Sequence, residues 1–153
     1  MSVTTQLDRP TNSMTETAAF ALPNRDVADL VSQSGAVDYR ALLDICSGSV
    51  DFLVILLEEF QVNGPRRVES LARRVERGDS QAASETAHDL KASAQAISAN
   101  TLRDLAGAIE KSCGFVGREC QEKLVGRLRR EMDRCLEQIP LVIATARAEE
   151  MEL

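Results

Sequence analysis

Apolar residues recur three or four positions apart along most of the chain, from about position 38 to position 148. This spacing places them on one face of a helix, whose period is about 3.6 residues. No segment alternates apolar and polar residues between turn residues, as a half-buried strand would. The pattern therefore predicts an all-α protein with four substantial helices and one or two short ones.

The short helices are predicted near the amino terminus. Residues 26–32 form the first, and Asp38 is suited to cap a second that runs to about Cys46. The apolar positions of the first are Val27, Leu30 and Val31. The rest of residues 1–34 is polar and without sustained periodicity, which predicts a flexible leader.

The first long helix is predicted to begin after the turn Ser47-Gly48-Ser49. Residues 50–62 are apolar on almost every side, which is typical of a helix buried centrally in a bundle. Asn63-Gly64-Pro65 should kink or restart this helix, because proline removes a backbone donor and crowds the preceding turn. Apolar spacing then resumes as far as Arg77, and Gly78 ends the segment.

Three further helices follow. Asp79 is placed to cap residues 80–97, and the next helix opens at Asn100 or Thr101 and ends before Gly114. The last begins near Arg118, with Pro140 expected to kink or terminate it. Short connections between long amphipathic helices predict an antiparallel up-down four-helix bundle over residues 35–148.

Composition excludes several classes of protein. The formal net charge of −6 argues against binding to nucleic acid or to an anionic membrane surface, which depends on positive charge. The longest apolar run, residues 52–57, is too short to cross a bilayer, and residues 1–20 do not resemble a secretory signal. These features favour a cytoplasmic protein. The four cysteines lack CxxC spacing and a neighbouring histidine, so we predict no metal site and assign Cys113 and Cys135 to packing.

The only histidine, His88, lies near the middle of the helix predicted over residues 80–97. On a helical wheel it projects roughly 140° from the centre of the apolar face and should meet solvent. The apolar face consists of Ala83, Ala87, Leu90, Ala94 and Ile97. The polar stripe around His88 consists of Gln81, Ser84, Lys91 and Gln95. Lys91, one turn on, can hold an ammonium near an anion on the ring, while Ser84 and Ala92 are small enough for a partner to approach. An incidental surface histidine is the alternative.

Residues 87–99, AHDLKASAQAISA, resemble the signature A-H-x-L-K-G-S-[AS]-x-x-[IL]-G-A of histidine phosphotransfer (HPt) domains. The resemblance covers roughly residues 35–148, with Gly78-Asp79 before the signature and Ile109-Glu110 after it. It implies that His88 is phosphorylated, that Lys91 is its electrostatic partner and that Gln95 is an adjacent polar contact. Ser84, Ala92 and Gln95 are the expected partner-docking residues. Ala92 and Ser98 replace family glycines, and Ala92 lies where a response regulator docks closely.

The resemblance implies a monomeric phosphoryl carrier between receiver-domain aspartates, with a response-regulator receiver domain, a hybrid sensor kinase or both as partners. The receiver would supply the Mg²⁺ ion. No Walker motif or glycine-rich ATP loop is present, so we expect no autonomous kinase activity. The exposed Nε2 is the natural candidate for phosphorylation, and the choice between the two ring nitrogens stays open at this point. Two alternatives remain: a helical interaction or scaffold module with an inert His88, and a relative that binds a receiver or kinase without carrying phosphate. A hydrolase or metalloenzyme is disfavoured, because one histidine cannot complete the usual sites.

Overall fold

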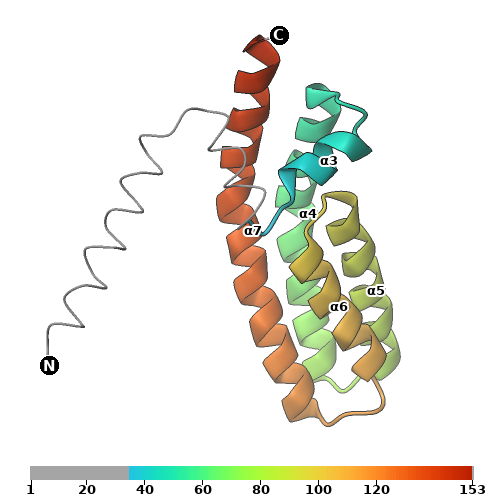
Figure 1. Ribbon diagram of the computed structural model, residues 1–153. Coiled ribbons are helices and arrows are strands. Elements are labelled where there is room, and N and C mark those ends of the chain that lie inside the picture. The colour runs from blue at the N-terminus through green and yellow to red at the C-terminus, as the bar shows by residue number, and fades with distance from the viewer. Residues whose placement is uncertain (1–34, 153) are drawn as a thin grey trace, which may run out of the picture.

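The computed structural model describes residues 35–152 of the chain, and this part contains five helices and no strand (Figure 1). The all-α prediction is confirmed, whereas the short helix predicted over residues 26–32 lies outside the described residues. The helices are α3 (Tyr39–Ile45), α4 (Val50–Glu76), α5 (Ser80–Ala96), α6 (Asn100–Ser112) and α7 (Arg118–Glu152). None of them is both long and apolar enough to cross a membrane.

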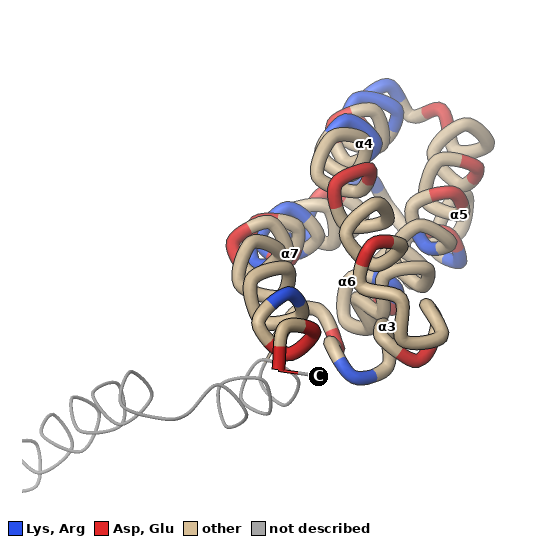
Figure 2. The backbone as a smooth tube through the Cα atoms, turned by 90° about the horizontal axis from the view of Figure 1, so that it is seen from above, with Lys and Arg blue, Asp and Glu red and all other residues tan. Residues whose placement is uncertain are grey.

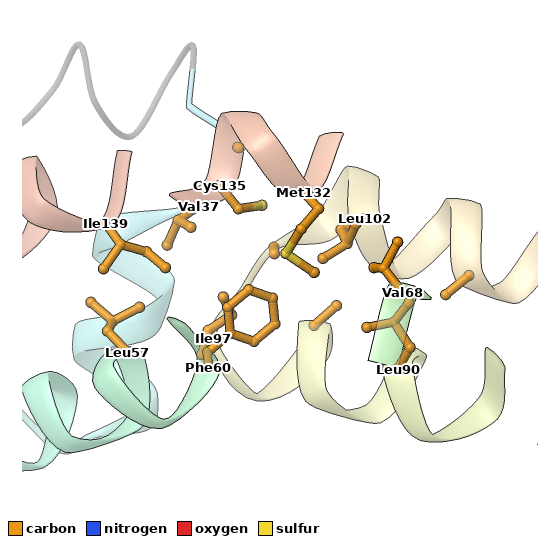
Figure 3. Close-up of a cluster of buried hydrophobic side chains, with 14 of the residues drawn as sticks. Val37, Leu57, Phe60, Val68, Leu90, Ile97, Leu102, Met132, Cys135 and Ile139 are labelled. Carbon is orange, nitrogen blue, oxygen red and sulfur yellow. The ribbon is translucent and has the colours of Figure 1, made fainter. Parts of the chain in front are cut away.

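The four longer helices enclose one apolar core. Helix α4 packs against α5 and α7, α6 packs against the same two helices, and the short α3 lies against α4 (Figure 1). Figure 3 shows side chains from these helices and from the segment before α3 meeting in the core; those labelled are Val37, Leu57, Phe60, Val68, Leu90, Ile97, Leu102, Met132, Cys135 and Ile139. Burying a side chain the size of leucine stabilises a fold by about 1.5–3 kcal/mol, so this core holds the helices in register.

Three predicted amino-terminal caps are confirmed. The side chain of Asp38 accepts a hydrogen bond from the backbone of Ala41 at 3.1 Å, at the start of α3. Ser49 caps α4 in the same way, and Asp79 caps α5 by accepting from the backbone of Ala82 at 3.1 Å. Each cap satisfies an amide that has no partner inside its helix, so these residues fix where the helices begin.

Neither proline ends its helix, so the predicted restart after Pro65 and the predicted termination at Pro140 are wrong, while a kink at either proline stays a prediction. Pro65 lies inside the continuous helix α4, and α7 continues through Pro140 to Glu152. A proline removes one hydrogen bond from a helix, but tertiary packing on either side can outweigh that loss. Buried residues flank Pro65 (Phe60 and Val68) and Pro140 (Ile139 and Val142).

Helix α4 is also less buried than the apolar pattern of residues 50–62 predicts. Phe52, Ile55 and Val62 are 46%, 60% and 55% exposed, because α4 packs mainly against α5 and α7 and leaves one face in solvent. The expectation of a helix buried on every side is therefore wrong, although its inner face, with Leu53 and Leu57, is fully buried.

A tight turn reverses the chain between α5 and α6. Ser98 has φ +59°, in the left-handed region, and the backbone of Ala99 donates to the carbonyl of Ala94 at 2.9 Å. The carbonyl of Ser98 also accepts from the backbone of Asp38 at 2.9 Å, which ties this turn to the start of α3. The left-handed conformation gives a physical reason for the family glycine at this position. The turn sends α6 back along α5 and so positions the site described next.

Candidate functional site

His88 lies on the outer face of α5, and its side chain is 63% exposed. The opposite face of the helix carries Ala83, Ala87 and Leu90, which are buried in the core. The predicted exposure of the imidazole is therefore confirmed. The same packing that anchors the helix leaves the ring open to an approaching protein.

A carboxylate on the neighbouring helix contacts both predicted site residues. Nδ1 of His88 lies 2.7 Å from Oε2 of Glu110, and Nζ of Lys91 lies 3.4 Å from Oε1 of the same residue. We call His88, Lys91 and Glu110 the His88 cluster. The structure brings His88 and Lys91 together through Glu110, which bridges α5 and α6.

The close approach of α5 to α6 makes this bridge possible. Gly107 is buried in α6, and a Cβ atom there would lie 3.6 Å from Cδ of Lys91, so the lysine stem runs close over the glycine. One turn before His88, the hydroxyl of Ser84 donates to the backbone carbonyl of Glu110 at 3.5 Å. Small residues at this interface therefore let the carboxylate reach the imidazole.

Glu110 stays ionised well into the acidic range. Its partial burial by itself raises the pKa, but the hydrogen bonds from His88 and Lys91, together with their positive charges, outweigh it and lower the pKa of Glu110 below its usual value. An ionised carboxylate only accepts hydrogen bonds. The side chain of Glu110 is 24% exposed, so its two bonds are partly shielded from competition with water.

This contact determines which nitrogen of His88 carries the proton. Because Glu110 accepts at 2.7 Å, Nδ1 of His88 must be the donor. In the neutral ring Nε2 then carries a lone pair and no hydrogen. A neutral imidazole fixed in this tautomer on an exposed surface is a nucleophile available to a partner.

The three expected docking residues are arranged around His88. Ala92 and Gln95 are exposed, whereas Ser84 is only partly exposed because its hydroxyl turns toward α6. Ala92 also lines a cavity of about 250 Å³ between α4 and α5, together with Leu56 and Phe60. A partner that covers His88 would meet a hollow on the α4 side of α5 that Glu59 and Arg67 line beside these apolar residues.

Cysteines take no part in this site. Cys46 and Cys135 are buried, Cys113 packs against the core from a half-buried position, and Cys120 is exposed. The assignment of Cys113 and Cys135 to packing is therefore confirmed. Burial, followed by the nearby Glu131, raises the pKa of Cys135 to about 12, so its thiol is not a nucleophile. Among residues 35–152 no group of three or more His, Cys, Asp or Glu side chains could hold a metal ion.

Sequence reasoning assigned no role to Glu110. The residue lies 22 positions after His88, and no local spacing pattern links residues so far apart. Glu110 could be found from the way in which two helices joined by a short turn align with each other. Pairing α5 with α6 about the turn at Ser98 brings Glu110 opposite His88.

Comparisons with known proteins agree with this site. The family model of the Hpt domain matches residues 55–140, more than half of the chain, and the match includes the whole His88 cluster. Searches of curated proteins and of solved structures found no match. Hpt domains act in histidine phosphotransfer in phosphorelays, where they carry phosphoryl groups and interact with receiver domains and kinases. The extent of the match and the histidine on the outer face of a helical bundle show that the chain belongs to the Hpt domain family.

Proposed function

We propose that this protein relays a phosphoryl group between receiver-domain aspartates through Nε2 of His88. The observation that carries the proposal is the 2.7 Å contact between Nδ1 of His88 and Glu110, which leaves Nε2 unprotonated on a ring that is largely exposed. An antiparallel up-down arrangement of α4 to α7 is the proposed scaffold. Its partners are a response-regulator receiver domain, a hybrid sensor kinase, or both.

The transfer begins with attack of Nε2 on the phosphorus atom of an aspartyl phosphate. The N–P bond forms as the bond from phosphorus to the aspartate oxygen breaks, and the electron pair of that bond leaves with the aspartate carboxylate. Nδ1 keeps its proton, so the ring becomes positively charged. Glu110 stabilises this charge through its hydrogen bond.

Onward transfer reverses these events. An aspartate oxygen of a second receiver attacks the phosphorus atom, the N–P bond breaks and His88 leaves as the neutral ring. The Mg²⁺ ion that offsets the charge of the phosphoryl group is expected on the receiver domain. The chain itself is proposed to act as a carrier without kinase activity of its own.

Lys91 is proposed to stabilise the phosphoryl oxygens. Its ammonium lies one turn from His88 and carries three N–H donors, and its contact with Glu110 at 3.4 Å holds it beside the ring. A phosphoryl group on Nε2 would place several anionic oxygens on this side of α5. The lysine can then share its donors between the carboxylate and the phosphoryl group.

Docking is proposed to take place over His88 and the exposed residues beyond it. Ala92 and Gln95 lie one and two turns further along α5, and Ser84 lies one turn before. Ala92 presents a methyl group where the family signature has glycine. This difference is expected to restrict how closely a receiver approaches and so to limit the range of partners.

Transfer of radiolabel from a phosphorylated receiver domain tests the proposal. Wild-type protein should gain label in an acid-labile form, as expected of phosphohistidine, and His88→Gln should gain none. Asp89→Asn is a matched control, because Asp89 is an exposed neighbour on the same helix, and it should accept label normally. Binding of receivers without any label transfer would instead establish a non-carrying interaction module, and equal labelling of His88→Gln would show that another residue is the acceptor.

A further inference from the structure

Several basic residues lie on α4 (Figure 2), and two of them contact hydroxyl groups of α5. A guanidinium N–H of Arg67 donates to the hydroxyl of Ser93, and one of Arg74 donates to the hydroxyl of Thr86. The two contacts lie two turns apart on each helix, a rise of about 10 Å. We call these four residues the arginine–hydroxyl ladder. It joins α4 to α5 at two separate levels.

Each hydroxyl of the ladder is also bound to its own helix. The hydroxyl of Thr86 donates to the carbonyl of Ala82 at 2.9 Å, and that of Ser93 donates to the carbonyl of Asp89 at 3.1 Å. Thr86 is only 6% exposed, so its contact with Arg74 is shielded from water. Because each hydroxyl is fixed to the backbone of α5, the arginine that binds it holds the helix itself.

The apolar face of α5 constrains the helix less than the ladder does. Its buried residues are mainly alanines, namely Ala83, Ala87 and Ala94, with Leu90 as a larger member. Methyl groups interlock with a neighbouring helix less than large side chains do, so they oppose sliding and rotation only weakly. Hydrogen bonds are directional and weaken steeply when their geometry changes. The ladder therefore supplies a register that alanine packing does not specify.

We propose that Arg67 and Arg74 are positioning residues for His88. Along α5 the histidine lies between the two hydroxyls of the ladder, so the contacts from α4 enclose the turn that carries the imidazole. A small rotation of α5 would move Nδ1 of His88 away from Oε2 of Glu110, which lies 2.7 Å from it. The ladder holds α5 from the α4 side and thereby keeps this contact with α6 in place.

Variants of the two hydroxyl residues test the proposal, because Thr86→Val and Ser93→Ala break the ladder without changing any charge. The combined variant should raise the share of the Nε2–H form of His88, which nitrogen NMR reads from the only histidine of the chain. Ser93→Ala alone, at a half-buried position, gives the same measurement if the combined variant does not fold. Unchanged nitrogen shifts in the folded variant would overturn the proposal.

Thr145→Val is the matched control. It makes the same chemical change at a buried threonine of α7 and should leave the nitrogen shifts of His88 unchanged. An equal change in the shifts of this control would also overturn the proposal, because the tautomer would then respond to any loosening of the core.

A double-mutant cycle separates positioning from a general loss of stability. Breaking the ladder should slow phosphoryl acceptance roughly threefold in the wild-type background. It should have no further effect in Glu110→Ala, which already lacks the contact that the ladder maintains. Equal slowing in both backgrounds would overturn the proposal.

The two measurements also distinguish this proposal from the proposed function. The rate measurement rests on phosphoryl transfer through His88, whereas the nitrogen shifts require no transfer at all. A protein that accepts no label, but whose His88 tautomer depends on the ladder, would contradict the proposed function and support the positioning role.

Discussion

Nδ1 of His88 and Oε2 of Glu110 lie 2.7 Å apart, although 22 positions separate the two residues in the chain. The contact joins α5 to α6 and gives the imidazole a defined tautomer before any partner arrives. Lys91 binds the other oxygen of the same carboxylate at 3.4 Å. Glu110 is therefore a positioning residue for both side chains.

Replacing Glu110 should change the tautomer of His88. In wild-type protein the imidazole nitrogen shifts should show a protonated Nδ1 and an unprotonated Nε2, and Glu110→Ala should raise the share of the Nε2–H form. Nitrogen NMR measures this directly, since the chain has one histidine. Loss of a charge-assisted hydrogen bond should also slow phosphoryl acceptance about tenfold or more. Glu110→Gln keeps an oxygen acceptor, so its share of the Nε2–H form and its transfer rate should lie between those of wild type and Glu110→Ala. Unchanged nitrogen shifts in Glu110→Ala would rule out a positioning role for Glu110.

Lys91→Ala should slow phosphoryl transfer without unfolding the protein. Its side chain is 37% exposed, and an ion pair of this kind contributes less than about 1 kcal/mol to stability. Stopped-flow transfer from a phosphorylated receiver and urea denaturation measure the two effects. Lys111→Ala removes an exposed lysine next to Glu110 in the chain and is the control. Equal transfer rates in the two variants would argue against a role for Lys91.

The contribution of Glu110 to stability should depend on pH. Its pKa is lower in the folded protein than in the unfolded chain, so its stabilising effect is fully present above the unfolded value of about 4.5. The effect is lost as the pH falls through the lowered folded pKa. The difference in free energy of unfolding between wild type and Glu110→Gln should therefore shrink below about pH 4.5. A difference that stays constant from pH 7 to pH 3 would contradict the lowered pKa.

Ser98→Gly should stabilise the protein by about 1 kcal/mol, because glycine adopts the left-handed conformation of this turn without steric cost. Chemical denaturation measures the change. Ser98→Ala keeps a Cβ atom and should bring no such gain. Ser70→Gly, inside α4, should destabilise by roughly 0.5–1 kcal/mol, which separates the turn effect from a general effect of glycine.

Ala92→Gly tests the docking surface. The methyl group of Ala92 is exposed one turn beyond His88, so its removal should speed transfer from a receiver that approaches closely. The same change should lower stability by roughly 1 kcal/mol, since glycine disfavours the helix. The transfer rate should therefore rise while the free energy of unfolding, measured by urea denaturation, falls. Slower or unchanged transfer in a variant that remains folded would contradict the steric restriction.

Local sequence signals predicted the features that depend on neighbouring residues. Asp79 and Ser49 cap helices where the sequence places them, and the helical period put His88 on the exposed face of α5. The predicted helix ends at the two prolines failed for a physical reason that lies outside the local sequence. The effects of Pro65 and Pro140 were judged from local backbone sterics, but packing across the core holds both helices together.

The sequence did not predict a role for Glu110, because that role depends on a contact between two helices. Its role depends on the pairing of two helices, and a single sequence contains no direct record of which residues meet across that pair. Ser98 was predicted only in part. The family signature has glycine at this position, but the physical reason for that glycine is visible only in the φ of +59° at Ser98. Residues that act through a neighbouring element therefore required the structure.

The His88 cluster also has a charge balance. When the ring is uncharged, the charges of Lys91 and Glu110 cancel, so the cluster is neutral as a whole. A phosphoryl group would add about two negative charges, while the ring, protonated at Nδ1, would gain one positive charge, so the loaded cluster would carry a net charge of about −1. The loaded cluster would carry an excess of negative charge that the unloaded one lacks. This excess negative charge would favour departure of the phosphoryl group toward a receiver domain that holds a metal ion, whereas the hydrogen bond from Nδ1 to Glu110 stabilises the charged ring.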